Sequence, residues 1–312
     1  MSETLQVHRA SQTERIEAYR NVHEFWGRGL AQDEYVEGRL KSIKHNQAEW
    51  YVGSLDGKVV TSLGCYPLQF RLHEETLAGI GLGAVHTLPT CRGRGFAPQL
   101  IRFVEDVQHE AGAGLSLLYS DIKPSYYAAL GYRECPSWSG WCEIARPSDR
   151  GGQRCRLERC SIPSEQQALV ELYDDYHAKL SFSIARSPEY WRHLISREPH
   201  DEFYWLVSPN SQHVGYVRLR PDEDQILVRD LALADHSDEM MAELCDALQS
   251  HAAEQSAARV GGWLPDVPGV RGAFALSARP NEITMIKLLG KSTVVSDIDL
   301  AAAQHFHEID HV

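Results

Sequence analysis

The sequence predicts an α/β (α+β) chain made of two similar halves, each a mixed, twisted sheet flanked by helices. Apolar strand patterns alternate with amphipathic helix patterns along the 312 residues. A polar stretch with proline and glycine, 146–154, interrupts this alternation and is typical of a linker. Beyond it a similar order of strands and helices begins again. We therefore expect one domain at 1–145 and a second at 155–312.

The first half is predicted to start with a strand at Leu5–Val7, and its pattern then gives helices at 13–26 and 33–43. Asp56-Gly57 between two apolar runs is a strong hairpin signal. The elements expected after the helices are strands at 49–55, 58–70 and 76–88, a helix at 97–113, a strand at 115–120, a helix at 125–130 and a last strand at 141–144.

The turn between the strand at 76–88 and the helix at 97–113 contains Arg92, Gly93, Arg94 and Gly95. Glycines at a helix start allow a ligand to approach the backbone, and the free N–H groups and dipole of the first turn favour an anion. The two arginines add positive charge, so this turn is predicted to hold a pyrophosphate. It is not a Walker loop, because Phe96-Ala97 stands where Lys-Ser/Thr would be, and its two glycines are too few for a dinucleotide fingerprint.

Two motifs in this half resemble those of the GNAT superfamily of N-acetyltransferases. The first is Arg-x-x-Gly-x-Ala, formed by Arg92, Gly95 and Ala97. The second is the segment 125–132, Ser-Tyr-Tyr-Ala-Ala-Leu-Gly-Tyr, which follows a short apolar strand. The resemblance covers about residues 1–145 and implies acetyl-CoA as co-substrate, without a metal. The coenzyme contacts it implies are Val85, His86, Thr87, Arg92, Gly93, Arg94, Gly95, Phe96 and Ala97.

The resemblance also implies that Tyr127 protonates the departing thiolate, whereas Tyr126 and Tyr132 are expected in the core. A tyrosine hydroxyl suits this task because its pKa lies near that of a thiol. A backbone N–H at 85–87 is expected to polarise the thioester carbonyl, and the amine then attacks directly in a ternary complex. The alternative for Tyr127 is a buried tyrosine whose hydroxyl only finds a partner.

Three further residues are candidates for the acceptor side. His86 is a candidate general base, the alternative being a histidine that is only hydrogen-bonded. Phe25 and Trp26, at the end of the first predicted helix, would border an acceptor pocket in this family, the alternative being core packing.

The second half repeats the order with strands at 155–159, 203–207, 214–220 and 225–233 and helices at 163–179, from Ser187, and at 238–254. Its connection at 232–238 has no glycine or arginine and contains Asp235 and Asp238, so this copy is not expected to bind coenzyme A. An active half followed by a degenerate one resembles the enhanced-intracellular-survival N-acetyltransferases, as does the Arg-x-x-x-Tyr-Trp string from Arg186 to Trp191. Those enzymes usually continue into a sterol-carrier-like third domain and place their C-terminal carboxylate in the active site. This sequence stops near where that domain would begin, which leaves the carboxylate of Val312 an open alternative as base.

Composition narrows the function classes. The formal charge of −12 and the lack of a Lys/Arg cluster argue against nucleic acid and mildly favour a cationic substrate. With no apolar run near 18 residues and no basic leader, a cytoplasmic protein without a membrane partner is expected. Seven scattered cysteines favour reduced thiols, and the histidines near the end of the chain are expected in a disordered tail rather than at a metal.

Two other functions stay open: a mycothiol-synthase-like tandem acyltransferase and a non-catalytic acyl-CoA sensor. The acceptor is an amine of a small molecule or of a lysine side chain. The second half is expected to shape the acceptor pocket or to form a homo-oligomer interface.

Overall fold

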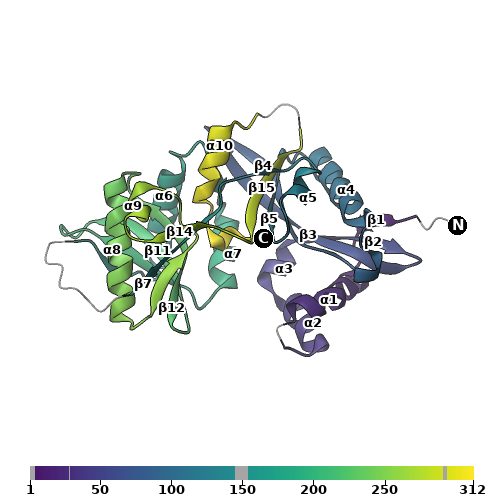
Figure 1. Ribbon diagram of the computed structural model, residues 1–312, viewed down its shortest axis with the longest axis horizontal. Helices are drawn as coiled ribbons and strands as arrows, with labels where there is room; N and C mark the ends of the chain where they lie inside the picture. The colour runs from purple at the N-terminus through teal and green to yellow at the C-terminus, as the bar shows by residue number, and fades with distance from the viewer. Residues whose placement is uncertain (1–3, 28, 145–153, 291–293) are drawn as a thin grey trace.

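The computed structural model describes residues 4–27, 29–144, 154–290 and 294–312, which form two lobes, each with its own sheet (Figure 1). The expected linker at 146–154 lies, except for Arg154, outside the described residues. The strands of the first sheet, in spatial order, are β1 (Gln6–Arg9), β2 (Glu49–Leu55), β3 (Lys58–Leu72), β4 (Glu75–Thr87), β5 (Leu115–Ser120), β15 (Ile283–Leu288) and β6 (Arg133–Glu134). β9 (Phe182–Ala185) pairs with the far part of β3.

The second sheet repeats the first position by position. Its strands, in the corresponding order, are β8 (Arg156–Arg159), β10 (Glu202–Val207), β11 (His213–Asp222), β12 (Gln225–Leu233), β13 (Arg259–Gly262), β7 (Trp138–Glu143) and β14 (Ala275–Ala278). Among the strands that the structure describes, only the fourth and fifth of each sheet, β4 with β5 and β12 with β13, pair in parallel. The two halves are therefore tandem GNAT-like sheets, as the repeated order of elements predicted.

The sixth strand of each sheet comes from the other half of the chain. β15 pairs with β5 and β6 in the first lobe, and β7 pairs with β13 and β14 in the second (Figure 1). The strand expected at 141–144 was therefore assigned to the wrong sheet, and the sheets do not separate at the linker. A strand pattern shows that a segment pairs, but not with which neighbour, so the exchange had no local signal.

The helices that the sequence predicted begin and end close to the expected positions, whereas α3, α9 and α10 were not predicted. Those of the first half are α1 (Gln12–Trp26), α2 (Gln32–Lys41), α3 (Ile43–Gln47), α4 (Phe96–Glu110) and α5 (Ser125–Ala128). Those of the second are α6 (Gln166–His177), α7 (Pro188–Arg197), α8 (Asp238–Glu254), α9 (Pro268–Arg271) and α10 (Asp297–Ala302). Ser187 and Ser237 cap α7 and α8, and Pro188 occupies the first turn of α7, as their residue types predicted.

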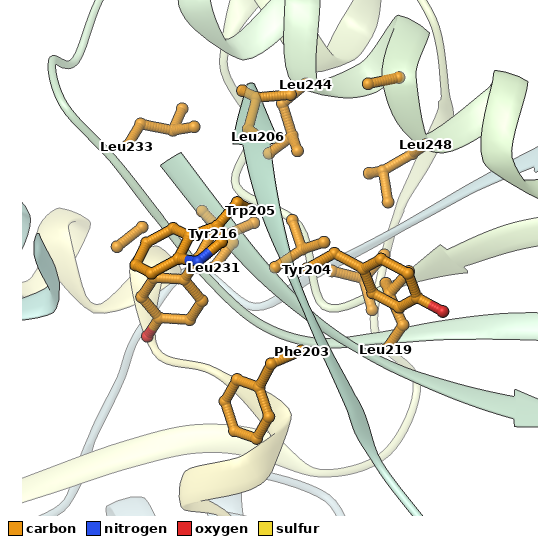
Figure 2. Packing of buried hydrophobic residues seen from close by; sticks show 14 of the residues in the cluster. Phe203, Tyr204, Trp205, Leu206, Tyr216, Leu219, Leu231, Leu233, Leu244 and Leu248 are labelled. Atoms are coloured by element: carbon orange, nitrogen blue, oxygen red, sulfur yellow. The ribbon is translucent and has the colours of Figure 1, made fainter. Parts of the chain in front are cut away.

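Apolar side chains of β10 line both faces of the second sheet. Figure 2 shows Phe203 and Trp205 directed away from Tyr204 and Leu206, the alternation expected of a strand that is covered on both sides. Leu244 and Leu248 of α8 close one face. The second lobe thus has its own packed core, from which β15 and the end of the chain extend to the first lobe.

The last ten residues cross from the second lobe to the first. Short 3₁₀ turns at Ala303–His305 and Glu308–Asp310 lead into Phe306 and Val312, which pack against Tyr66, Leu68 and Phe70 of β3. The expectation of a disordered tail with free histidines was wrong, because this segment buries apolar side chains against the first sheet.

Candidate active site

The strands β4 and β5 separate at their carboxyl ends and open the first sheet. Their pairing runs from Gly79 with Leu115 to Leu82 with Leu118. After Leu82, β4 continues to pair with β3 alone. A β-bulge shifts the register of this pairing between Gly83 and His86, and Ala84 within it has φ 52°. The opening leads into a cavity of about 1080 Å³ that reaches the start of α4 on one side and the end of the chain on the other.

The start of α4 lines this cavity with backbone. Gly93 and Gly95 have φ of 76° and 79°, a conformation that favours glycine, and Gly95 is the N-cap, with no side chain capping the first turn. A Cβ on either glycine would meet no atom within 4 Å, so the space beside the turn is open. Leu100, Ile101 and Val104 anchor the helix in the core, which fixes the direction of its first N–H groups. Such a helix start can bind an anion, and the open space beside it has room for one.

The two arginines of the turn lie differently. Arg92 lines the cavity, donates from Nε to the Thr87 carbonyl over 3.2 Å and stands 5.3 Å above the Phe25 ring. Arg94 does not line it, and its guanidinium covers Phe96 at 4.6 Å. Of the predicted coenzyme contacts, all except Arg94 line the cavity: Val85, His86, Thr87, Arg92, Gly93, Gly95, Phe96 and Ala97.

Tyr127 lies on α5 and lines the same cavity from the β5 side. It is 8% exposed and packs edge-to-face against Tyr126 and Tyr132. Burial first, then Tyr126 and Asp121, raises its pKa, so the hydroxyl keeps its proton at neutral pH. Tyr132 belongs to the core, as expected, and donates to Glu105. Tyr126 does not, because it is 37% exposed and lines the cavity.

Comparison with known proteins agrees with this geometry. Residues 6–135 match the family model described as an acetyltransferase (GNAT) domain. This segment is therefore similar to the GNAT acetyltransferase domain. None of the curated protein sequences matches the chain.

Solved structures share the fold of the GNAT domain and its companion lobe. A probable N-acyltransferase from Enterococcus faecalis is 14% identical with a TM-score of 0.71, the match covering 92% of this chain and 72% of that one. Eis1 from Mycobacterium abscessus is 18% identical with a TM-score of 0.59, covering 92% and 74%. N-myristoyltransferase from Saccharomyces cerevisiae, solved with myristoyl-CoA, is 10% identical with a TM-score of 0.58, covering 92% and 83%. The matched domain model and the shared fold are in line with acyl transfer from an acyl-CoA.

His86 of the GNAT domain is buried beside Phe25, with 5.6 Å between the ring centres. Its Nε2 has no hydrogen-bond partner among the described residues. Burial, and then the charge of Arg92, lowers the pKa of His86 to about 4. The imidazole is therefore neutral at pH 7 and a weak proton acceptor.

Phe25 and Trp26 form part of the cavity mouth rather than the core. They are 47% and 36% exposed and line the cavity. Ile122 and Tyr126 line it from the β5 side and are also exposed. The mouth thus presents large apolar side chains on two sides, although large aromatics at a helix end are more often buried.

The start of α8 in the second lobe corresponds to the start of α4 but is closed to an anion. The Ser237 hydroxyl caps the Met240 N–H, and Asp235 accepts from both the backbone and the hydroxyl of Ser237. Asp238 and Glu239 then place negative charge in the first turn. A phosphate would find the Met240 N–H already taken by the cap and would meet the carboxylates of Asp235, Asp238 and Glu239 there.

Sequence patterns did not indicate several residues of the cavity. These are Arg39, Lys44, Asp121, Glu282 and His311, with the backbone of Val312 beside them. A Cβ placed on Gly83 would lie 2.9 Å from the Val312 carbonyl carbon, so the end of the chain touches β4 at the bulge. The resemblance to the enhanced-intracellular-survival enzymes was the one signal for Val312. The others come from elements far apart in sequence.

The described residues contain no helix that is apolar and long enough to cross a membrane. Within the same ranges, no three His, Cys, Asp or Glu side chains are grouped so that they could bind a metal ion.

Proposed function

We propose that the chain is an N-acetyltransferase that moves an acetyl group from acetyl-CoA to a primary amine by direct attack in a ternary complex. The observation that supports it most is that one cavity contains the glycine cradle at α4, the opened edge of β4 and the Tyr127 hydroxyl. No protein nucleophile is needed for this reaction.

Each part of the cavity has a task in the proposal. The first turn of α4 and the Arg92 guanidinium hold the pyrophosphate, and the coenzyme supplies an acetyl thioester. Backbone N–H groups at 85–87, on the edge of β4 that β5 leaves unpaired, bind the thioester oxygen. Tyr127 gives its proton to the departing sulfur, which its raised pKa allows because the hydroxyl is protonated at neutral pH.

Two groups are candidates for accepting the amine proton. His86 is close to the opened strand, but its low pKa makes the transfer unfavourable, and hydrogen bonding through Nε2 suits it better. The carboxyl group at Val312 is the second candidate, since Val312 lines the cavity on the side of Gly83. We propose the Val312 group as acceptor, directly or through a water.

The C-terminal half shapes the acceptor side in this proposal. Glu282, His311 and Val312 line the cavity and all come from the last 31 residues of the sequence. The C-terminal half of the sequence thus contributes to the site through segments that reach the first lobe, while the start of α8 is not proposed to bind coenzyme A.

Thiol release from acetyl-CoA with a panel of amines tests the proposal, with identification of the acetylated product by mass. Transfer to the nitrogen of at least one amine class, much slower in Tyr127→Phe, is the expected result. Tight binding of acetyl-CoA without transfer to any amine would favour the sensor function instead.

A further inference from the structure

One wall of the cavity carries two cations that have no carboxylate partner among the described residues. Lys44 on α3 and Arg39 on α2 both line the cavity. The Arg39 guanidinium contacts His45 Nε2 and covers the Tyr35 ring at 4.9 Å. The Lys44 ammonium has no hydrogen bond or ion pair within the ranges that the structure describes. Lys44 is partly buried, and a ligand that supplies the opposite charge would stabilise its ammonium.

Further positive charge lies behind this wall. Burial and the charges of Arg197, Arg39 and Arg229 lower the pKa of Lys44 to about 7. Two carboxylates act in the other direction, Glu198, which already pairs with Arg220 and Arg229, and Glu282, whose pKa is raised by burial and partly lowered again by Lys44. The wall therefore has a surplus of positive charge that the protein does not neutralise locally.

A second wall of the cavity is acidic. Asp121 follows β5 and Glu282 precedes β15, and the Glu282 N–H donates to Asp121 Oδ1 over 3.2 Å. The carboxylate of Glu282 lies 3.8 Å from His311 Nε2. Asp121 also acts on Tyr127, whose pKa it helps to raise. The acidic wall thus adjoins the proposed proton donor, where a substrate amine has to be placed.

The opposed charges point to an acceptor of one chemical class. We propose, building on the proposed function, that the acceptor is zwitterionic: its amine lies at Asp121 and Glu282, and its carboxylate or phosphate lies at Lys44 and Arg39. The exposed rings of Phe25 and Trp26 at the mouth suit an apolar substituent between the two groups. This class differs from the cationic substrate that the net charge of −12 mildly favoured, because overall charge does not determine the charge of a pocket.

The proposal includes a pH dependence of binding. The charged and titratable groups that act on Lys44 or are affected by it are Arg39, His45, His193, Arg197, Glu198, Arg229, Glu282 and His311. Above pH 7 the free ammonium loses its proton, and a bound anion favours its return. Binding of an anionic amine at pH 8 is therefore expected to take up protons, which shows as a dependence of the binding heat on the ionisation heat of the buffer.

The test is calorimetric binding in the presence of coenzyme A, with matched probes. L-phenylalanine is compared with phenethylamine, and O-phosphoethanolamine with ethanolamine, so that the two pairs separate a carboxylate from a phosphate. The wild type is expected to bind one of the anionic amines more tightly than its neutral-tailed partner. Lys44→Gln should weaken that binding about tenfold or more, as expected for one charge-assisted hydrogen bond. Lys44→Arg should retain most of it.

Lys41→Gln is the matched control, because Lys41 is exposed on α2 and pairs with Glu37 at 2.5 Å. It should leave all four affinities unchanged. Equal affinities within both pairs, or no binding of either anionic amine, would overturn the zwitterionic acceptor.

The binding test is kept separate from the test of catalysis. If the protein acetylates amines without an anionic group as well as those with one, the proposed N-acetyltransferase reaction is supported and the zwitterionic acceptor class is overturned. Binding that depends on Lys44, without transfer of acetyl to any amine, supports the anion site and overturns the proposed reaction instead.

Discussion

Arg186 and Asp310 are joined by two hydrogen bonds in the interior, from Nε to Oδ1 over 3.1 Å and from Nη2 to Oδ2 over 2.7 Å. Arg186 precedes α7 and Asp310 is two residues before Val312, so the pair fixes the end of the chain to the second lobe. Arg186 also binds Asp230 of β12 through both terminal nitrogens and lies 3.9 Å from the Tyr173 ring. The buried pair therefore positions the residues that enter the cavity.

Asp310→Asn should lower both stability and turnover. The change leaves the buried guanidinium with one carboxylate, Asp230, and the free energy of unfolding should fall by about 3 kcal/mol. Because the end of the chain loses its anchor, kcat should fall while the KM for acetyl-CoA stays the same. Denaturant unfolding and steady-state kinetics measure the two effects. Glu189→Gln, which breaks the exposed ion pair with Arg192, is the control and should change neither the free energy of unfolding nor kcat.

Tyr127→Phe tests the acid role. Loss of a general acid should reduce kcat by about 10²–10⁴-fold, with binding of coenzyme A unchanged by calorimetry. Tyr126→Phe is the matched control, since the neighbouring ring also lines the cavity but has no assigned proton transfer. Nearly full turnover in Tyr127→Phe would make this tyrosine a packing residue.

Gly95→Ala tests the cradle. A Cβ at φ 79° strains the turn and stands in the space proposed for the pyrophosphate. Coenzyme A binding should weaken about tenfold or more, given a strain of about 1–2 kcal/mol added to the steric effect. Gly112→Ala controls for strain alone, since Gly112 has φ 102° at the other end of α4. If the two variants bind coenzyme A equally well, the cradle is misassigned.

Gly83→Ala tests the place of Val312. The added methyl would lie 2.9 Å from the Val312 carbonyl carbon and 3.0 Å from its oxygen, so the end of the chain must shift. We expect kcat to fall at least about tenfold, with unchanged binding of coenzyme A, because the proposed proton acceptor moves. Gly38→Ala on α2, where a Cβ meets nothing within 4 Å, is the control. Wild-type kcat in Gly83→Ala would remove Val312 from the reaction.

The wall of the cavity that the start of α4 and α5 form could be predicted from sequence because it is built from contiguous residues. The turn from Arg92 to Ala97 and Tyr127 on α5 carry their chemistry in local spacing. In the structure Tyr127 and the residues of this turn other than Arg94 line one cavity. The strand β4, the amphipathic α4 and the caps Ser187 and Ser237 follow from local patterns for the same reason.

The acceptor side could not be predicted, because tertiary structure assembles it. Lys44 follows α2 without any motif, and Glu282 enters only because β15 joins the first sheet. β7 and β15 are exchanged between the two sheets, and the local sequence of a strand does not determine with which sheet it pairs. Tail histidines are ordinarily free, yet His307 is buried here because Phe306 beside it packs against the first sheet.

On acidification, the fold should begin to lose stability at pH values well above the usual pKa of carboxylates. Burial is the main cause that lowers the pKa of His45, His193 and His305 to about 3 and of His86 to about 4. Between these values and 6.5 the unfolded chain binds more protons than the folded one. The free energy of unfolding therefore falls as the pH drops from about 6.5 to about 4, and the stability is fully present above 6.5.

His86→Gln should remove part of this dependence, on the order of 2 kcal/mol between pH 7 and pH 4, because the group that resists protonation is gone. Urea unfolding at a series of pH values measures it, with exposed His200→Gln as control. The same variant tests the base role: a general base at residue 86 would shift the pH profile of kcat/KM, whereas a neutral hydrogen-bonding imidazole would change its height alone. An acid stability slope equal to that of the wild type would mean that His86 is protonated as easily in the folded protein as in the unfolded chain.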